Sequence, residues 1–123
     1  MAQDRDEIYR LVGELLRSIQ HGDPAALVGF GVSPAIYEEI LEELDSVGEN
    51  MVELTLPPYD IAFIPDRTGR IPLCSYAMDA SPQRKRVECQ LWSGEKKTEL
   101  TLIADYPEKL GKTSLVFRLL ETQ

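Results

Sequence analysis

The sequence contains little of the chemistry that metal sites and thiol enzymes require. It has two cysteines, Cys74 and Cys89, and one histidine, His21. No CxxC pair is present, and a structural zinc site needs four Cys or His ligands, so we expect no metal. Each cysteine lies in a strand-like segment with apolar residues nearby, Leu73 next to Cys74 and Val87 and Leu91 two positions from Cys89, which predicts reduced, buried thiols. His21 precedes Gly22 at an expected helix end, where a histidine commonly stabilises the negative end of the helix dipole.

Signals for membrane insertion, export and common hydrolases are also missing. No apolar run approaches the roughly 18 to 20 residues that cross a bilayer. The N-terminus, MAQDRDEIYR, is charged and lacks the apolar core of a signal peptide. The sequence contains neither a GxSxG serine motif nor the complete GxxxxGK(S/T) pattern of a phosphate-binding loop. It therefore predicts a cytoplasmic protein without a cofactor and without a membrane partner.

Basic residues are scarce in the first half of the chain. Residues 1–66 contain fourteen Asp or Glu against three Arg, whereas residues 67–123 contain seven acidic and ten basic residues. The whole chain has a formal charge of −8. Nucleic acid is a poor partner for such a protein, because Lys and Arg supply most of the affinity for phosphates. A basic protein surface fits better, since opposite charges speed association.

An ordered series of helix signals occupies the N-terminal part of the chain. Residues 4–20 place apolar side chains at helical spacing and acidic ones near the N-terminal end, which predicts an amphipathic helix. Asp23 followed by Pro24 is typical of a helix start, and Ser33 followed by Pro34 repeats the pattern. We therefore expect three helices before Gly48.

After these helices the apolar period falls towards two, and Gly and Pro separate shorter segments. The predicted strands are 51–56, 60–64, 71–79, 85–93, 97–105 and 113–121. The polar stretch SPQRKR is expected to be only a connection. Helices followed by antiparallel strands predict a single α+β domain over residues 1–123, with three N-terminal helices packed on a curved, mainly antiparallel sheet.

The stretch LWSGEKKTELTL combines a glycine turn with strict alternation on both sides. This pattern predicts a hairpin loop between two long strands. Leu91 and Leu102 should face the core, while Lys96 and Lys97 lie in water. Trp92 alternates with Leu91 and should therefore pack on the other face of the sheet, beneath a partner or a second copy if that face is open.

The order of elements, the QHGDPAAL junction and the LWSGEKKTELTL hairpin together resemble the nuclear-transport-factor-2-like superfamily (NTF2-like, also called cystatin-like cone). The hairpin is similar to that of a bacterial family associated with immunity and toxin-neighbourhood proteins. The resemblance covers nearly the whole chain in element order. It implies a cone in which the sheet wraps around the helices, and a protein partner such as a cognate toxin.

Some cone domains are isomerases or dehydratases, which need an acid-base pair in an apolar pocket. Residues of the right type here are Tyr9, Asp60, Asp79 and Tyr76. Tyr9 also suits a partly buried position beside the apolar stripe, Asp60 follows a PPY turn, and Asp79 precedes ASPQ and suits a loop cap. A small-molecule enzyme with Tyr9, Asp60 and Asp79 as catalytic residues is the alternative function.

The third predicted helix and the residues just after it are rich in carboxylates that have almost no basic partner nearby in sequence. A solvated face explains them in part, and a docking surface for a cationic protein explains their accumulation. We therefore expect a non-enzymatic binding protein, an immunity protein that covers the basic surface of a toxin. A homodimer without ligand stays open as a further alternative. The expected partner-binding residues are Glu38, Glu39, Glu42, Glu43, Asp45, Glu49 and Trp92.

Overall fold

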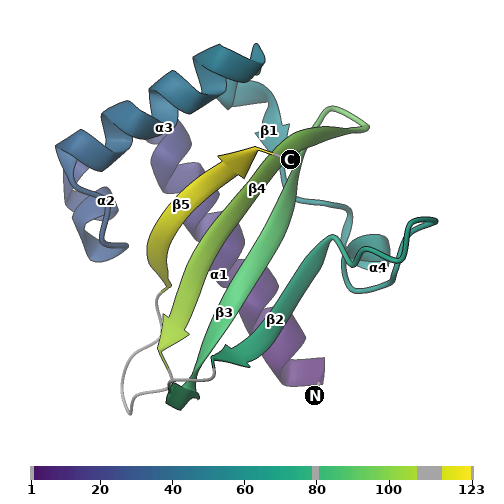
Figure 1. Ribbon diagram of the computed structural model, residues 1–123. Coiled ribbons are helices and arrows are strands. Elements are labelled where there is room, and N and C mark those ends of the chain that lie inside the picture. The colour runs from purple at the N-terminus through teal and green to yellow at the C-terminus, as the bar shows by residue number, and fades with distance from the viewer. Residues whose placement is uncertain (1, 79–80, 108–114, 123) are drawn as a thin grey trace.

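The computed structural model describes residues 2–78, 81–107 and 115–122, in which helices lie against one face of an antiparallel sheet (Figure 1). Helix α1, Ala2–His21, runs diagonally behind the sheet. One stripe of α1 is buried, and each such side chain contributes about 1.5–3 kcal/mol when it leaves water. The buried apolar residues of this stripe are Ile8, Leu11, Val12, Leu15, Leu16 and Ile19.

Two shorter helices follow, as the sequence predicts. Helix α2 spans Pro24–Gly29 and helix α3 spans Pro34–Val47. The Ser33 hydroxyl accepts a hydrogen bond from the backbone N–H of Ile36 at 3.2 Å, which satisfies one free donor at the start of α3. Gly48 ends α3 with φ of 74°, a left-handed conformation that glycine adopts without steric cost. The prediction of three N-terminal helices is confirmed.

All strands belong to one sheet in which every pair is antiparallel. Its order is β1-β3-β4-β5, and β2 also pairs with β3, on the same edge as β1. The predicted α+β class and antiparallel sheet are therefore confirmed. The strands are β1 Leu54–Thr55, β2 Leu73–Met78, β3 Ser81–Ser93, β4 Lys96–Pro107 and β5 Val116–Thr122.

The structure corrects three boundaries. The predicted strand 60–64 is instead helix α4, Tyr59–Ala62. Pro58 precedes it with a fixed φ, and its carbonyl accepts the N–H of Ile61, so a helical turn forms. The predicted strand 51–56 is a 3₁₀ turn at Met51–Glu53 followed by the two residues of β1. The stretch SPQRKR belongs to β3, because cross-strand pairing with β2 and β4 extends the strand beyond its alternating part.

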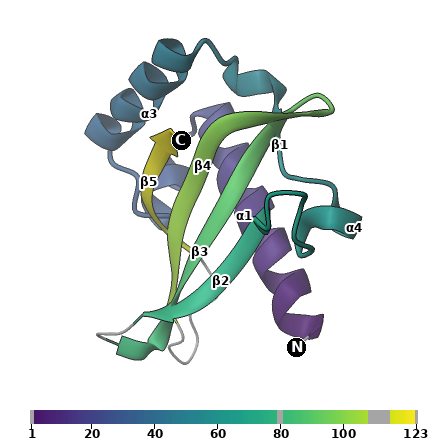
Figure 2. The ribbon, with the colours of Figure 1, turned by 45° about the vertical axis from the view of Figure 1, so that its right-hand side comes forward.

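The two faces of the sheet have different surroundings. The inner face packs on α1, and Val87, Cys89 and Leu91 of β3 contribute to a hydrophobic core shared by the described helices and strands. No described helix covers the opposite face, which we call the outer face (Figures 1 and 2). Both cysteines are free. Burial raises the pKa of the Cys89 thiol, which keeps it protonated and unreactive.

Candidate functional site

Helix α3 presents its carboxylates away from the core. Ile40 and Leu44 are buried, whereas Glu38, Glu42 and Asp45 are exposed. These three acidic residues recur at positions i, i+4 and i+7, so they share one stripe of the helix. We call this stripe the acidic face of α3. Helix α3 lies at the end of the sheet where β5 finishes (Figure 1).

The remaining predicted binding residues surround this stripe. Glu39 is exposed, while Glu43 and Glu49 are partly buried. The Glu43 carboxylate accepts a hydrogen bond from the Thr122 hydroxyl at the end of β5. Within the described part of the chain, no ion pair involves a carboxylate of α3. The negative charge of α3 is therefore not neutralised by these internal contacts.

Tyr9 and Asp60, two of the three predicted catalytic residues, have separate surroundings. The Tyr9 hydroxyl donates to the carbonyl of Pro57 at 2.8 Å, and the Tyr9 ring packs edge-on against Tyr59. Burial raises the pKa of Tyr9, and the charge of Asp60 raises it further without a hydrogen bond between the two. Asp60 itself is exposed on α4. Asp79 lies outside the described residues.

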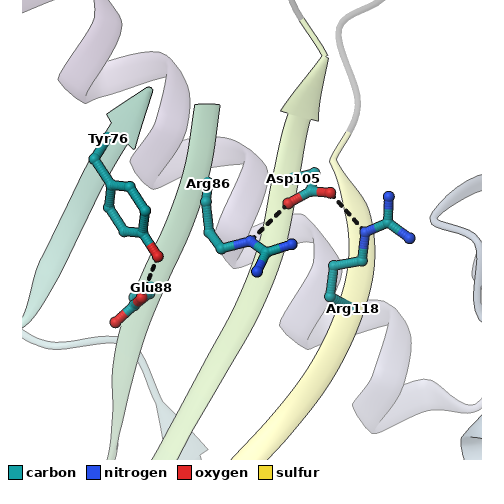
Figure 3. A network of polar contacts seen from close by, with 5 residues as sticks. All are labelled: Tyr76, Arg86, Glu88, Asp105 and Arg118. Atoms are coloured by element: carbon teal, nitrogen blue, oxygen red, sulfur yellow. Dashed lines mark hydrogen bonds and ion pairs between the residues drawn. The ribbon is translucent and has the colours of Figure 1, made fainter. Parts of the chain in front are cut away.

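The outer face carries a charged network that joins three strands (Figure 3). The Asp105 carboxylate on β4 accepts from Nε of Arg86 on β3 at 3.0 Å and from Nε of Arg118 on β5 at 2.6 Å. Asp105 is 3% exposed. Burial raises its pKa, but the hydrogen bonds from Arg118 and Arg86 outweigh burial, so the pKa lies below its usual value. The carboxylate therefore stays charged and ties the strands together.

Tyr76 has a structural role on the same face. Its hydroxyl donates to the Glu88 carboxylate at 2.6 Å (Figure 3). This hydrogen bond, together with burial, raises the pKa of Tyr76 to about 12. A tyrosine with this pKa stays protonated at neutral pH and gives no support to acid-base chemistry. The contact links β2 to β3.

The connection between α4 and β2 is attached to β4. The Asp66 carboxylate accepts from the Lys97 ammonium at 2.8 Å and also from Thr68. These contacts hold the pKa of Asp66 well below its usual range. A guanidinium nitrogen of Arg70 donates to the Thr101 hydroxyl at 2.5 Å. Lys97 is exposed, as predicted, but it also anchors this connection.

Trp92 lies beside this attachment, opposite Lys97 in the strand register. It is 9% exposed and is not a member of the core cluster that contains Leu91, which agrees with a position on the other face of the sheet. Its indole Nε1 and the side-chain oxygen Oε1 of Gln90 are buried and have no hydrogen-bond partner among the described residues. The chain itself covers Trp92, so a contact with a partner stays a prediction.

A substitution of Gln90 tests whether its buried side-chain oxygen lacks a hydrogen-bond partner. Gln90 is 7% exposed, and a buried polar group without a partner costs about 1–3 kcal/mol. Gln90→Met, which keeps the length of the side chain, is therefore expected to raise the free energy of unfolding by about 1 kcal/mol. Urea denaturation measures the change. Thr101→Val is the matched control, because it removes a satisfied hydroxyl and should lower stability. A loss of stability in Gln90→Met would show that the amide is hydrogen bonded in solution.

Comparison with known proteins does not identify a relative. The chain matches no protein-family model, no curated protein and no solved structure. Among the described residues, no helix has the length and apolar character to cross a membrane. The same residues contain no group of three or more His, Cys, Asp or Glu side chains that could hold a metal ion. The proposed function therefore rests on the chemistry of the protein's surfaces.

The sequence indicates the acidic helix but not the outer-face network. Six carboxylates between residues 38 and 49 are visible as a composition signal. Asp105, Arg86 and Arg118 are far apart in the chain, and only the strand register brings them together. The only hint of the network in the sequence is that each of the three is a charged residue within an alternating strand. Which residue it pairs with depends on the register of the neighbouring strand.

Proposed function

We propose that the protein is a non-enzymatic binding domain whose acidic face of α3 docks onto a basic surface of another protein. The observation that carries the proposal is the exposure of Glu38, Glu42 and Asp45 on one stripe without a basic partner among the described residues. Carboxylates that are already in water and unpaired can meet cationic side chains without first breaking internal contacts.

The proposed mechanism is occlusion. An immunity-type protein with a cone-shaped fold would cover the basic active-site or substrate groove of a toxin, with the acidic face of α3 opposite the toxin's Lys and Arg side chains. Complementary charge raises the association rate and makes it sensitive to salt. Both cysteines are free thiols, which suits a protein that acts in the reducing cytoplasm.

The contacts of the candidate catalytic residues favour binding over catalysis. The Tyr9 hydroxyl is occupied by the Pro57 carbonyl, and the Asp60 carboxylate is exposed on α4. A general acid and base must lie within hydrogen-bond reach of one substrate atom. Tyr9 and Asp60 have separate environments. We therefore assign Tyr9 to packing and Asp60 to the exposed surface.

Charge reversal on α3 tests the proposed function. The variant Glu38→Lys, Glu42→Lys, Asp45→Lys is compared with the control Glu95→Lys, Glu99→Lys, Glu121→Lys, in which three exposed acids outside α3 are changed. Both variants change the net charge equally. We expect partners captured from an extract of the encoding organism to bind the wild type and the control, and to bind the α3 variant at least about tenfold more weakly, a difference of about 1.4 kcal/mol.

Two further measurements make the outcome clear. Circular dichroism and thermal melting should show that both variants fold like the wild type, because the substituted side chains are in water. Titration of the identified partner at two salt concentrations should show weaker binding of the wild type at high salt. Equal binding of the partner to the α3 variant and the control would contradict the proposal.

A further inference from the structure

A cavity lies between the N-terminal part of α1, α4 and the edge of β2. Its volume is about 240 Å³, and its walls include the apolar side chains of Ile8, Phe63, Ile71 and Leu73 and the basic side chains of Arg5 and Lys85. Pockets that enclose a drug-sized ligand have volumes of roughly 300–1,000 Å³. This cavity is smaller, so it suits one large apolar side chain with a charged group at the rim.

Arg5 is the group at the rim whose hydrogen-bonding capacity is not used. Its guanidinium carbon lies 5.5 Å from the centre of the Phe63 ring, a cation–π contact that holds the side chain beside the cavity. Among the described residues, Arg5 takes part in no hydrogen bond and no ion pair. Arg10, five residues further along α1, bonds instead to Glu7 and Glu14. Arg5 is thus positioned to bind an external oxyanion.

The edge of β2 supplies a third element of recognition. Strand β2 pairs with β3 only, so its other side presents backbone N–H and C=O groups that no described strand satisfies. Leu73, Cys74 and Ser75 of this strand also line the cavity. In both views β2 borders the sheet, with α4 and the N-terminal half of α1 beside it (Figures 1 and 2). An extended peptide can therefore pair with β2 and reach the cavity.

We propose that the β2 edge and this cavity bind the C-terminal segment of a protein that ends in a large apolar residue. The peptide backbone adds a strand to β2, the last side chain fills the cavity beside Phe63 and Ile71, and the terminal carboxylate meets the Arg5 guanidinium. Strand addition provides affinity, and the pocket and the carboxylate contact provide specificity. This site is separate from the acidic face of α3 and selects the opposite charge, so it stands whether or not α3 docks a basic partner.

The test uses short peptides of neutral composition. The full chain labelled with ¹⁵N is titrated with acetyl-Thr-Thr-Val-Thr-X, where X is Leu, Val or Phe with a free carboxylate, and with the same peptides as C-terminal amides. The free acids are expected to shift the amide signals of Cys74–Tyr76 and the Nε–H signal of Arg5. The amides should bind at least about tenfold more weakly, because the charged acceptor is lost.

Variants locate the carboxylate contact. Arg5→Gln is expected to weaken binding of the free acids about tenfold and to remove the preference over the amides. Arg10→Gln, an exposed substitution on the same helix, should bind like the wild type. Neither side chain is part of the core, so both variants should fold, and the shift pattern of unbound Arg5→Gln verifies this directly.

Three outcomes would overturn the proposal. They are equal affinity for acids and amides, unchanged binding in Arg5→Gln, and dissociation constants above about 1 mM for all three free acids. A further arm uses 4-methylpentanoate, which resembles the end of a leucine without a peptide backbone. If it bound as tightly as the peptide acids, the site would belong to small carboxylic acids and strand addition to β2 would be wrong.

Discussion

Replacing Trp92 with alanine is expected to lower the free energy of unfolding by about 3–5 kcal/mol, the loss typical of a buried aromatic ring. Only 9% of Trp92 is exposed, and the residue is paired with Thr55 of β1 on one side and Lys97 of β4 on the other. Removing the ring leaves a void where three strands meet. Guanidinium denaturation monitored by circular dichroism measures the loss.

Trp92→Phe separates packing from hydrogen bonding. Because the indole Nε1 has no partner in the part of the chain that the structure describes, phenylalanine removes an unsatisfied donor while keeping most of the ring, and it should cost clearly less than alanine. The same variants test the predicted partner contact. If Trp92→Ala kept its stability and lost only partner binding, the residue would serve an interface and the structural role argued from its burial would be wrong.

Asp105→Ala is expected to lower the free energy of unfolding by about 2–3 kcal/mol at pH 7, since hydrogen bonds to charged groups contribute about 1.5–3 kcal/mol each. We place the value below the sum for two such bonds because the side chains of Arg86 and Arg118 are 30% and 43% exposed and regain water. Urea denaturation of the variant and of Asp45→Ala, an exposed control on α3, measures the difference. A loss as small as that of the control would contradict the structural role of the network.

The effect of Asp105 should depend on pH in a defined direction. Its folded pKa is below the usual value, so its contribution is complete above the unfolded pKa of about 3.9. The contribution is lost as pH falls through the folded pKa. The stability difference between wild type and Asp105→Ala should therefore be constant near neutral pH and shrink below about pH 4. A difference that stayed constant to pH 2 would show that the carboxylate charge is not involved.

Most of the fold follows from local signals. Ser33 before Pro34 and glycine at position 48 mark the ends of α3, because caps are decided by neighbouring residues. The 60–64 segment was predicted wrongly because a short apolar run satisfies both strand and helix patterns. The early start of β3 at Ser81 was also missed, since polar residues join a strand when neighbouring strands pair with it, here β2 at Ser81 and β4 from Arg84.

Functional groups on the surface were predictable only where the residues that form them lie close together in the sequence. The acidic residues of α3 are close along the chain, and their exposure follows from the helical period. Arg5 lies at the start of α1 and Phe63 follows α4, with α2, α3 and β1 between them in the chain, and no local pattern pairs them. The same holds for Arg86 and Asp105, whose contact depends on the register of β3 and β4.

The pairing of β1 and β2 with the same edge of β3 has a consequence for how this domain tolerates change. Thr55 lies opposite Trp92, and Leu73 lies opposite Cys89, so residues 56–72 leave β3 and return to it at almost the same place. A loop with clamped ends can change in length at little entropic cost. Insertions in the exposed turns of residues 56–72 should therefore leave the sheet intact, provided that they keep Ala62 in the core and the contact between Asp66 and Lys97.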